Sequence, residues 1–230
     1  TNAQGIAMGD EFICHEAMEA GTLVRPFDLA IRSPRSYFLV VPTDKAEIYA
    51  IGEFLTTSEC RTLAGMIDVV AQPSTLYEGT EREGYRTSYS GNFSSDDPTI
   101  RMISRRIDDT LGMPAKVGET MQGQRYQPGQ QFKDHHDYFY PAEDYWKQER
   151  KNGGQRSWTA MMFLNTLERG GATGFPRLGI QIAPKAGVLL VWNNANPDGT
   201  PNENTLHAGT PVTEGVKYVI TRWYRTRKWG

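Results

Sequence analysis

The sequence predicts a mainly β fold with flanking helices (α+β), in which two or more N-terminal helices brace a jelly-roll core. Two segments before Gly118 carry apolar residues at helical spacing, and the chain after Gly118 is a series of short strands broken by glycine and proline. His135, Asp137 and His207 form a candidate metal face on the later strands. Many short strands with such turns are typical of a sandwich or barrel, and the jelly roll is the one whose interior can hold a metal.

The first predicted helix begins after Thr56. An extended segment over residues 47–55 leads into Thr56-x-x-Glu59, a capping box in which two side chains satisfy free backbone N–H groups at a helix start. The residues that follow place apolar side chains at i, i+3, i+4 and i+7, which gives the helix one apolar face: Leu63, Met66, Ile67 and Val70.

The second predicted helix begins at Asp97–Pro98, because proline suits the first helical position. Its buried side consists of Ile100, Ile103, Ile107 and Leu111. We expect both helices to cover one face of a sheet, which is a structural role.

The region after Gly118 changes from helical spacing to short strands. The predicted strands cover residues 119–126, 131–138, 158–165, 179–183, 187–192, 205–212 and 217–227. Between them, residues 141–152 are charged and aromatic. A solvated insertion is favoured slightly there over a loop or short helix near a lid.

The N-terminal residues divide the chain into two parts. Residues 1–42 form an extension with its own apolar clusters, and we expect it to pack on the core and to add an edge strand. Residues 43–230 form the catalytic domain. No function follows from the extension.

Composition limits the classes of partner and compartment. The chain has 230 residues and a formal net charge of −2, which offers no electrostatic footprint for nucleic acid or an anionic membrane. No apolar run approaches the ~18 residues that are needed to cross a bilayer. A secretory signal is not expected either, because the sequence shows no basic segment followed by an apolar stretch at its start. Two cysteines, Cys14 and Cys60, do not indicate a disulfide framework. We therefore expect a cytoplasmic protein that binds neither nucleic acid nor membranes.

His135, Asp137 and His207 are the residues that indicate chemistry. Alternate residues of a strand point to the same face, so His135 and Asp137 should converge while His136 points away. Two imidazoles and one carboxylate form the face that binds non-haem Fe(II) and leaves coordination positions open. Taken singly, each residue also fits an ordinary role, as a surface or N-cap pair and a partly buried histidine.

Lys217 lies ten residues after His207 and adds a second feature. A lysine at this distance can neutralise the far carboxylate of an acidic co-substrate. The four residues together favour an oxygenase that depends on Fe(II) and 2-oxoglutarate.

Five sequence motifs carry a resemblance to a known family. They are EFLTTSEC (53–60), RTSYSGNF (86–93), RYQPGQQFKDHHDYF (125–139), RSWTAMMFLNTLERGGATGFP (156–176) and TLHAGTPVTEGVKYVITRW (205–223). In this order they resemble the catalytic domain of the prolyl 4-hydroxylase family, within the 2-oxoglutarate-dependent dioxygenases. The resemblance covers most of the chain and implies a double-stranded β-helix (cupin-like) core.

The resemblance implies a role for each matching residue. His135, Asp137 and His207 would be the iron ligands. The residues that would contact 2-oxoglutarate are Lys217, on the 5-carboxylate, together with Tyr126 and Thr221. The residues that would contact the substrate are Arg86, Arg156 and Trp223, of which Arg86 also begins a loop that closes over the peptide. Ordinary surface charge for the two arginines and core packing for Trp223 stay open as alternatives.

Two positions depart from the family pattern. Phe132 and Phe163 stand where relatives often carry tyrosine, so two hydroxyl groups expected near the co-substrate and peptide pockets are missing. The loss of a neutral hydrogen bond changes binding by about 0.5–1.5 kcal/mol. We expect altered affinity with the reaction type retained.

The implied function is hydroxylation of peptidyl proline, with oxidative decarboxylation of 2-oxoglutarate to succinate and CO2. Fe(II), 2-oxoglutarate and O2 are the expected cofactors and co-substrates, and ascorbate is an expected reductant. The expected partner is a proline-containing peptide or protein, and exposed sheet edges make a homodimer a further expectation. Two alternatives remain: the same chemistry on a free amino acid or other small molecule, and a non-catalytic, cupin-like module that binds a metal or ligand.

Overall fold

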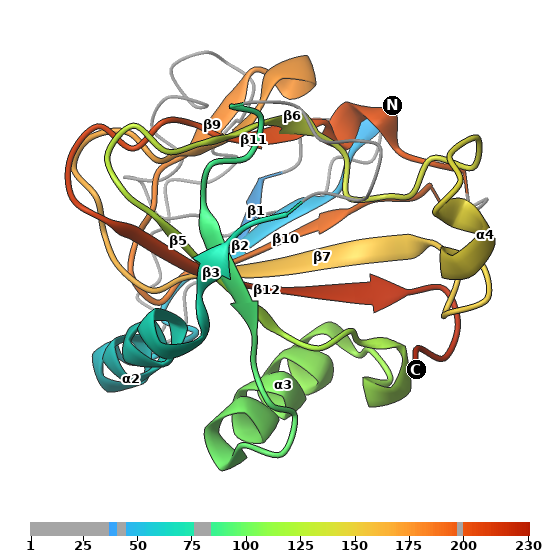
Figure 1. Ribbon diagram of the computed structural model, residues 1–230, viewed down its shortest axis with the longest axis horizontal. Coiled ribbons are helices and arrows are strands. Elements are labelled where there is room, and N and C mark those ends of the chain that lie inside the picture. The colour runs from blue at the N-terminus through green and yellow to red at the C-terminus, as the bar shows by residue number, and fades with distance from the viewer. Residues whose placement is uncertain (1–36, 41–44, 76–83, 197–199) are drawn as a thin grey trace, which may run out of the picture.

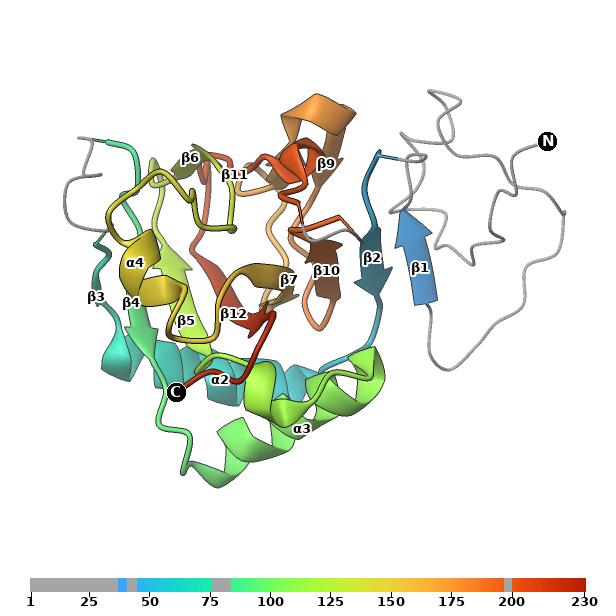
Figure 2. The ribbon, with the colours of Figure 1, turned by 90° about the vertical axis from the view of Figure 1, so that its right-hand side faces the viewer.

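Two facing antiparallel sheets form the core of the computed structural model, which describes residues 37–40, 45–75, 84–196 and 200–230 (Figures 1 and 2). The large sheet has eight strands in the order β1-β2-β10-β7-β12-β5-β4-β3. Their bounds are β1 Tyr37–Val40, β2 Ile48–Ile51, β10 Leu189–Asn193, β7 Arg156–Phe163, β12 Lys217–Arg225, β5 Gln122–Tyr126, β4 Tyr89–Asn92 and β3 Gln72–Pro73.

The small sheet has four strands in the order β6-β11-β8-β9. Their bounds are β6 Phe132–His135, β11 His207–Gly209, β8 Thr173–Phe175 and β9 Ile180–Ile182. The small sheet lies over one face of the large sheet, whereas the two long helices lie on the opposite face (Figure 2). The predicted jelly-roll core with bracing helices is confirmed.

The first long helix, α2 Thr57–Val70, has the predicted start. Thr56 is its N-cap: the hydroxyl oxygen accepts from the backbone N–H of Glu59 at 3.2 Å, and the Glu59 carboxylate accepts from the N–H of Thr56 at 2.8 Å. Leu63 and Ile67 of the predicted apolar face are fully buried. Complete burial of such a side chain contributes about 1.5–3 kcal/mol, so this face holds α2 on the sheet.

The second long helix, α3 Pro98–Leu111, is also confirmed. The Asp97 side chain caps it by accepting from the N–H groups of Thr99 and Ile100, at 2.8 and 3.1 Å. The predicted inner residues Ile100, Ile103 and Ile107 are buried in the same cluster as the inner residues of α2.

Alternation along the strands of the large sheet divides the core in two. Met162 of β7 and Leu189 of β10 pack toward the helices, whereas Met161 of β7 and Leu190 of β10 pack between the sheets. Both faces of these strands are buried, which explains their nearly continuous apolar sequence. The space between the sheets is where functional side chains gather.

Strand β12 shows the same alternation and carries the candidate residues on its inner face. Lys217, Thr221 and Trp223 all line the cavity between the sheets. The opposite face is tied to α3, because Asp108 accepts hydrogen bonds from Arg222 at 3.2 Å and Tyr224 at 2.7 Å. Helix α3 therefore helps to hold the strand that carries the site.

Several predicted boundaries differ from the structure. Strands β3, β4 and β8 were not predicted, since they are short and rich in glycine or polar residues. The predicted strand 131–138 ends at His135, so the expectation that Asp137 lies in the same strand is wrong. The segment 141–152 contains the short helix α4 Trp146–Glu149, which favours the short-helix alternative over a plain insertion. The described residues also include the 3-10 turns η2 Ala115–Val117, η3 Pro176–Leu178 and η4 Glu203–Thr205.

The N-terminal extension falls largely outside the described residues. Its strand β1 pairs antiparallel with β2 and lies at the edge of the large sheet (Figure 2). Residues 1–36 and 41–44 lie outside the described part, so their expected packing on the core stays a prediction. Within the described part, no helix has the length and apolar character needed to cross a membrane.

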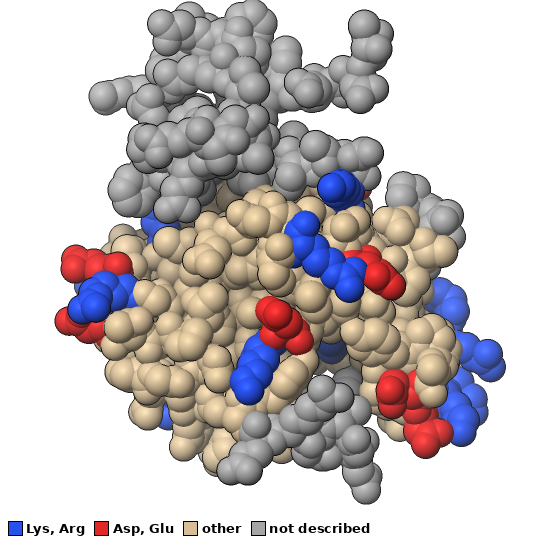
Figure 3. Space-filling model, turned by 90° about the horizontal axis from the view of Figure 1, so that it is seen from above, with Lys and Arg blue, Asp and Glu red and all other residues tan. Residues whose placement is uncertain are grey.

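Charged side chains of both signs lie close to one another on the face seen in Figure 3. Two of the exposed ion pairs in the described residues are Arg177–Glu203 at 2.7 Å and Lys147–Asp144 at 2.9 Å. Exposed pairs of this kind contribute about 0–1 kcal/mol each, so the fold depends chiefly on its two apolar clusters.

Candidate active site

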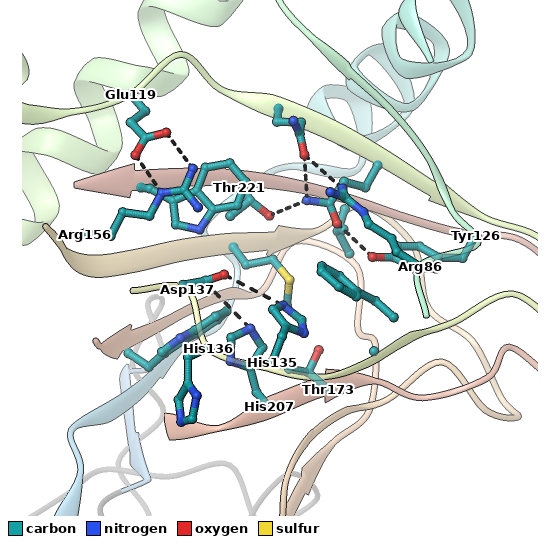
Figure 4. Close-up of a pocket in the computed structure, with 18 of the residues that line it drawn as sticks. Arg86, Glu119, Tyr126, His135, His136, Asp137, Arg156, Thr173, His207 and Thr221 are labelled. Carbon is teal, nitrogen blue, oxygen red and sulfur yellow. Dashed lines mark hydrogen bonds and ion pairs between the residues drawn. The ribbon is translucent and has the colours of Figure 1, made fainter. Parts of the chain in front are cut away.

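His135, Asp137 and His207 converge between the two sheets, as predicted (Figure 4). His135 ends β6 and pairs with His207, the first residue of β11, across the small sheet. Asp137 follows β6 and turns back, which places its Oδ1 3.8 Å from His135 Nε2 and its Oδ2 3.7 Å from His207 Nε2. The ligand atoms all lie within 4.8 Å of one another. A turn, rather than strand alternation, brings the carboxylate to the histidines.

Backbone carbonyl groups fix which nitrogen of each histidine faces the centre. His135 Nδ1 lies 2.8 Å from the Lys133 carbonyl oxygen, and His207 Nδ1 lies 2.9 Å from that of Thr205. A carbonyl oxygen can only accept, so each Nδ1 carries the hydrogen and each Nε2 presents a lone pair. Such outer partners orient the histidines that bind metals.

The charge states of His135 and Asp137 suit metal binding. Burial, followed by the nearby His207, lowers the pKa of His135 to about 3, so this imidazole is neutral at pH 7. Burial would raise the pKa of Asp137, but His207, His135 and Arg156 outweigh it and lower the pKa to about 2. Neutral imidazole and ionised carboxylate are the forms that bind a metal. Two nitrogens and one oxygen fit Fe(II) with open positions.

His136 points away from this group, as predicted. Its Nδ1 lies 2.7 Å from the Tyr140 hydroxyl group, and its Nε2 lies 3.1 Å from the Glu203 carbonyl oxygen. Both ring nitrogens thus have partners outside the triad.

Lys217 lines the same cavity of about 610 Å³ as the triad. The side chain is buried, and Nζ lies over the rings of Tyr126 at 5.4 Å and Phe163 at 5.5 Å. No carboxylate of the described residues pairs with it, and burial lowers its pKa to about 7. A buried ammonium group without a counter-charge is costly, so the site is suited to an anionic ligand.

Tyr126 and Thr221 line the same cavity as Lys217, and Gln124 joins them. The Tyr126 hydroxyl group donates to Gln124 Oε1 at 2.9 Å, and Gln124 Nε2 donates to Thr221 Oγ1 at 3.3 Å. Gln124 is not among the site residues predicted from the sequence. Its position two residues before Tyr126 in β5 places both side chains on one face, and this spacing could have revealed it.

Three further polar atoms point to a ligand in the same cavity. Among the described residues, the buried atoms without a hydrogen-bond partner include Thr173 Oγ1, Trp192 Nε1 and Trp223 Nε1. All three residues line the cavity. Buried polar groups are nearly always satisfied, so these atoms fit a site that a polar ligand completes.

The two phenylalanines at departing positions also line or support the site. Phe163 lies beside the Lys217 ammonium group, and Phe132 stacks on the His135 ring at 3.6 Å between ring centroids. One missing hydroxyl group is therefore close to Lys217, as expected for the co-substrate pocket, whereas the other is close to a metal-binding histidine and not shown to be in the peptide pocket.

Arg156 lines the cavity, and its guanidinium group is bound to the Glu119 carboxylate (Figure 4). Arg156 Nε and Nη2 donate to the two Glu119 carboxylate oxygens at 2.7 and 2.8 Å, and its guanidinium group lies 4.1 Å from the Trp223 ring centroid. Glu119 also accepts from the buried Arg225, which pairs with Glu149. This network was not predicted, because its members are far apart in sequence.

Arg86 reaches the cavity from the other side, next to Tyr126 (Figure 4). Its Nη2 donates to Gln122 Oε1 at 3.1 Å, and its guanidinium group lies 4.8 Å from the Phe132 ring centroid. Residue 86 is bridged to Phe132 of β6, so this part of the loop is joined to the small sheet. Residues 76–83, before Arg86, lie outside the described residues, and closure of the loop that begins at Arg86 stays a prediction.

Comparison with known proteins identifies the family. The model of the 2OG-Fe(II) oxygenase superfamily matches residues 121–225. Over 209 residues, the chain is 31% identical to probable prolyl 4-hydroxylase 10 of Arabidopsis thaliana, and the match covers 80% of this chain and 70% of that protein.

The chain belongs to the prolyl 4-hydroxylase family.

Other relatives agree with this assignment. A putative prolyl 4-hydroxylase of Acanthamoeba polyphaga mimivirus is 29% identical over 181 residues, covering 78% of this chain and 74% of that protein. A solved structure of the viral collagen prolyl hydroxylase vCPH from Paramecium Bursaria Chlorella virus-1, a 2OG complex, is similar with a TM-score of 0.62. It is 27% identical, and the match covers 80% of this chain and 97% of that one. The resemblance inferred from the motifs is confirmed.

Membership of the prolyl 4-hydroxylase family makes the protein a 2-oxoglutarate-dependent dioxygenase that uses Fe(II) and O2. The triad fits the metal, and the buried Lys217 with its polar neighbours fits an anionic co-substrate. The non-catalytic module is therefore not supported.

Proposed function

We infer that the protein hydroxylates proline residues of a peptide or protein, while 2-oxoglutarate is decarboxylated to succinate and CO2. One observation carries the inference: a cavity holds the two-histidine, one-carboxylate face at one position and an unpaired buried lysine at another. Family membership supplies the reaction type.

In this proposal His135, Asp137 and His207 hold Fe(II). The bound iron and 2-oxoglutarate supply the oxidising chemistry, and the protein supplies orientation and a water-poor site. Lys217 holds the distal carboxylate of 2-oxoglutarate through a charge-assisted bond, which is about twice as strong as a neutral one.

Gln124 sets the direction of the hydrogen bonds around that carboxylate. The Tyr126 proton goes to Gln124, and Gln124 in turn donates to Thr221. Because Thr221 Oγ1 accepts from the amide, its own proton is available for the ligand. Thr221 is therefore the hydroxyl donor that we place on the co-substrate.

Arg86, Arg156 and Trp223 form the substrate side of the proposed site. All three line the cavity that contains the triad. Glu119 fixes the Arg156 guanidinium group against the Trp223 ring, so the arginine presents a fixed edge to a peptide.

A peptide assay tests the function. Proline-containing peptides incubated with the protein, Fe(II), 2-oxoglutarate and ascorbate should gain one oxygen atom on proline, with one succinate formed per product. Mass spectrometry measures the first and succinate analysis the second. If varied proline peptides stay unmodified while a free amino acid is hydroxylated with matching succinate, the small-molecule alternative replaces this proposal.

Replacement of Arg156 by lysine should weaken peptide binding. Lysine keeps the charge but loses the fork of two bonds to Glu119 and the flat contact with Trp223. We expect the KM for peptide to rise about tenfold, which is ~1.4 kcal/mol, and the KM for 2-oxoglutarate to stay unchanged. Steady-state kinetics with each substrate varied in turn gives both constants.

The matched control for this variant is Arg105→Lys, since Arg105 is highly exposed and pairs only loosely with Asp109 at 3.5 Å. It should leave both constants unchanged. An increase confined to the KM for 2-oxoglutarate in Arg156→Lys would place Arg156 on the co-substrate and contradict the assignment.

Homodimerisation and a cytoplasmic location stay predictions. Sedimentation velocity of the purified chain and fractionation of the source cells are the measurements that test them.

A further inference from the structure

Behind the Asp137 carboxylate lies a chain of two buried polar side chains. Thr159 of β7 and Asn194, the residue after β10, are both 0% exposed. Thr159 Oγ1 lies 2.6 Å from Asp137 Oδ2, and Asn194 Nδ2 lies 2.8 Å from Thr159 Oγ1. Neither residue is among those assigned to the metal, the co-substrate or the peptide.

The direction of the protons along this chain follows from chemistry. An ionised carboxylate only accepts, so the single Thr159 proton goes to Asp137 Oδ2. The Thr159 oxygen must then accept from its other partner, which requires Asn194 to present its NH2 group. Asn194 therefore fixes the direction of the Thr159 hydroxyl group, and this hydroxyl group holds Asp137 Oδ2.

The backbone around Asn194 makes this arrangement rigid. The Asn194 N–H donates to the Ser157 carbonyl oxygen at 2.7 Å, and its carbonyl oxygen accepts from the Asn202 N–H at 2.9 Å. Asn202 in turn accepts from the Thr205 hydroxyl group at 2.8 Å, and the Thr205 carbonyl oxygen orients the His207 ring. Asn194, through Thr159, and Thr205, through its own carbonyl oxygen, thus support two of the three metal-binding side chains.

Thr159 donates to Asp137 Oδ2, which also lies 3.7 Å from His207 Nε2, whereas Oδ1 lies 3.8 Å from His135 Nε2. Each carboxylate oxygen thus faces one histidine of the triad, and the bond from Thr159 fixes this orientation.

We propose that Thr159 and Asn194 are positioning residues for the metal-binding carboxylate, whose orientation toward the two histidines they fix. The proposal rests on the proposed function, because it assigns a task to residues around the same metal site. Outer-sphere partners of this kind typically change metal affinity 10–100-fold.

The test is an anaerobic titration with Co(II) alone, followed by visible absorption, on the full chain and four variants. Thr159→Val keeps the shape but removes the hydroxyl group, whereas Thr159→Ser retains it. Asn194→Asp keeps the shape but offers an acceptor where the donor was, so it draws the Thr159 proton away from Asp137. Asn196→Asp is the matched control, since Asn196 lies in the same segment and bonds to Thr200 instead.

We expect Thr159→Val and Asn194→Asp to bind Co(II) 10–100-fold more weakly, with changed visible bands. Thr159→Ser and Asn196→Asp should bind as the parent does. Melting temperatures of the metal-free proteins separate this effect from a loss of packing. If both weakened variants melt lower but bind Co(II) within about threefold of the parent, the proposal is overturned. If Thr159→Val does not fold, Asn194→Asp decides by the same criterion.

The parent protein separates this proposal from the proposed function. If the parent and His207→Ala bind Co(II) equally poorly, the metal site itself is wrong. If the parent binds Co(II) tightly, His207→Ala does not, and Thr159→Val and Asn194→Asp both bind as tightly as the parent, the metal site stands and the positioning role fails.

Discussion

Lys217→Met should raise the concentration of 2-oxoglutarate required for half-maximal turnover about 100-fold while making the ligand-free protein more stable. Methionine fills the space under Tyr126 and Phe163 but removes the buried ammonium group. Loss of a buried charge partner costs a ligand about 2–5 kcal/mol, and each ~1.4 kcal/mol is tenfold in affinity. Affinity for 2-oxoglutarate should fall and stability should rise, because the buried charge favours ligand binding and disfavours folding.

The pH dependence of this variant has a definite sign. Burial lowers the pKa of Lys217 from 10.5 to about 7 in the folded protein. Between these values the unfolded state binds more protons, so the free energy of unfolding of the parent should increase as pH rises from about 7 to about 10. Lys217→Met should lack this increase. Urea unfolding of the metal-free protein across that range measures it.

The affinity for 2-oxoglutarate should also depend on the protonation state of Lys217. A carboxylate beside Lys217 raises its pKa again, so binding takes up a proton above pH 7 and the Kd for 2-oxoglutarate rises with pH there. Isothermal titration in buffers of different ionisation enthalpy counts the proton. Tyr218→Phe on the opposite face of β12 is the control and should behave as the parent does. Equal Kd values for parent and Lys217→Met would remove Lys217 from the co-substrate site.

His207→Ala should abolish hydroxylation and weaken metal binding by at least about 100-fold. The variant removes one of two imidazoles whose Nε2 atoms face Asp137, and the remaining pair cannot complete the three-ligand face. A metal that binds only the folded state raises stability, by about 2.7 kcal/mol at a concentration of 100 times its Kd. Mn(II) or Co(II) should therefore raise the melting temperature of the parent and leave that of His207→Ala unchanged.

The matched control for this experiment is His136→Gln. His136 adjoins the triad in sequence, but its ring nitrogens bond to Tyr140 and Glu203. It should retain the metal-induced increase in melting temperature. If His136→Gln loses the increase and His207→Ala keeps it, the ligand assignment is wrong.

Local patterns were sufficient for the two long helices. The Thr56–Glu59 capping box and the Asp97–Pro98 start lie within a few residues of the backbone groups that they satisfy, so they can be identified from sequence alone. The apolar faces of both helices followed from the 3.6-residue period in the same way.

Strand boundaries near the site were less predictable. The strand that contains His135 ends there, and Asp137 reaches the histidines through a turn. The His-x-Asp spacing still indicated the right atoms, because a turn after a strand can direct a side chain to the same point as the strand would. The chemistry was therefore correct although the local geometry was wrong.

The sequence by itself indicated the fold class, the family and the metal triad, and it predicted a lysine for an anionic co-substrate. Only the tertiary structure revealed that Glu119 holds Arg156 and that Asn194 and Thr159 hold Asp137. These partners are 37, 35 and 22 residues apart and come from separate strands and loops. A hydrogen bond between strands depends on sheet order and register, and neither is encoded in the spacing of the residues that form it.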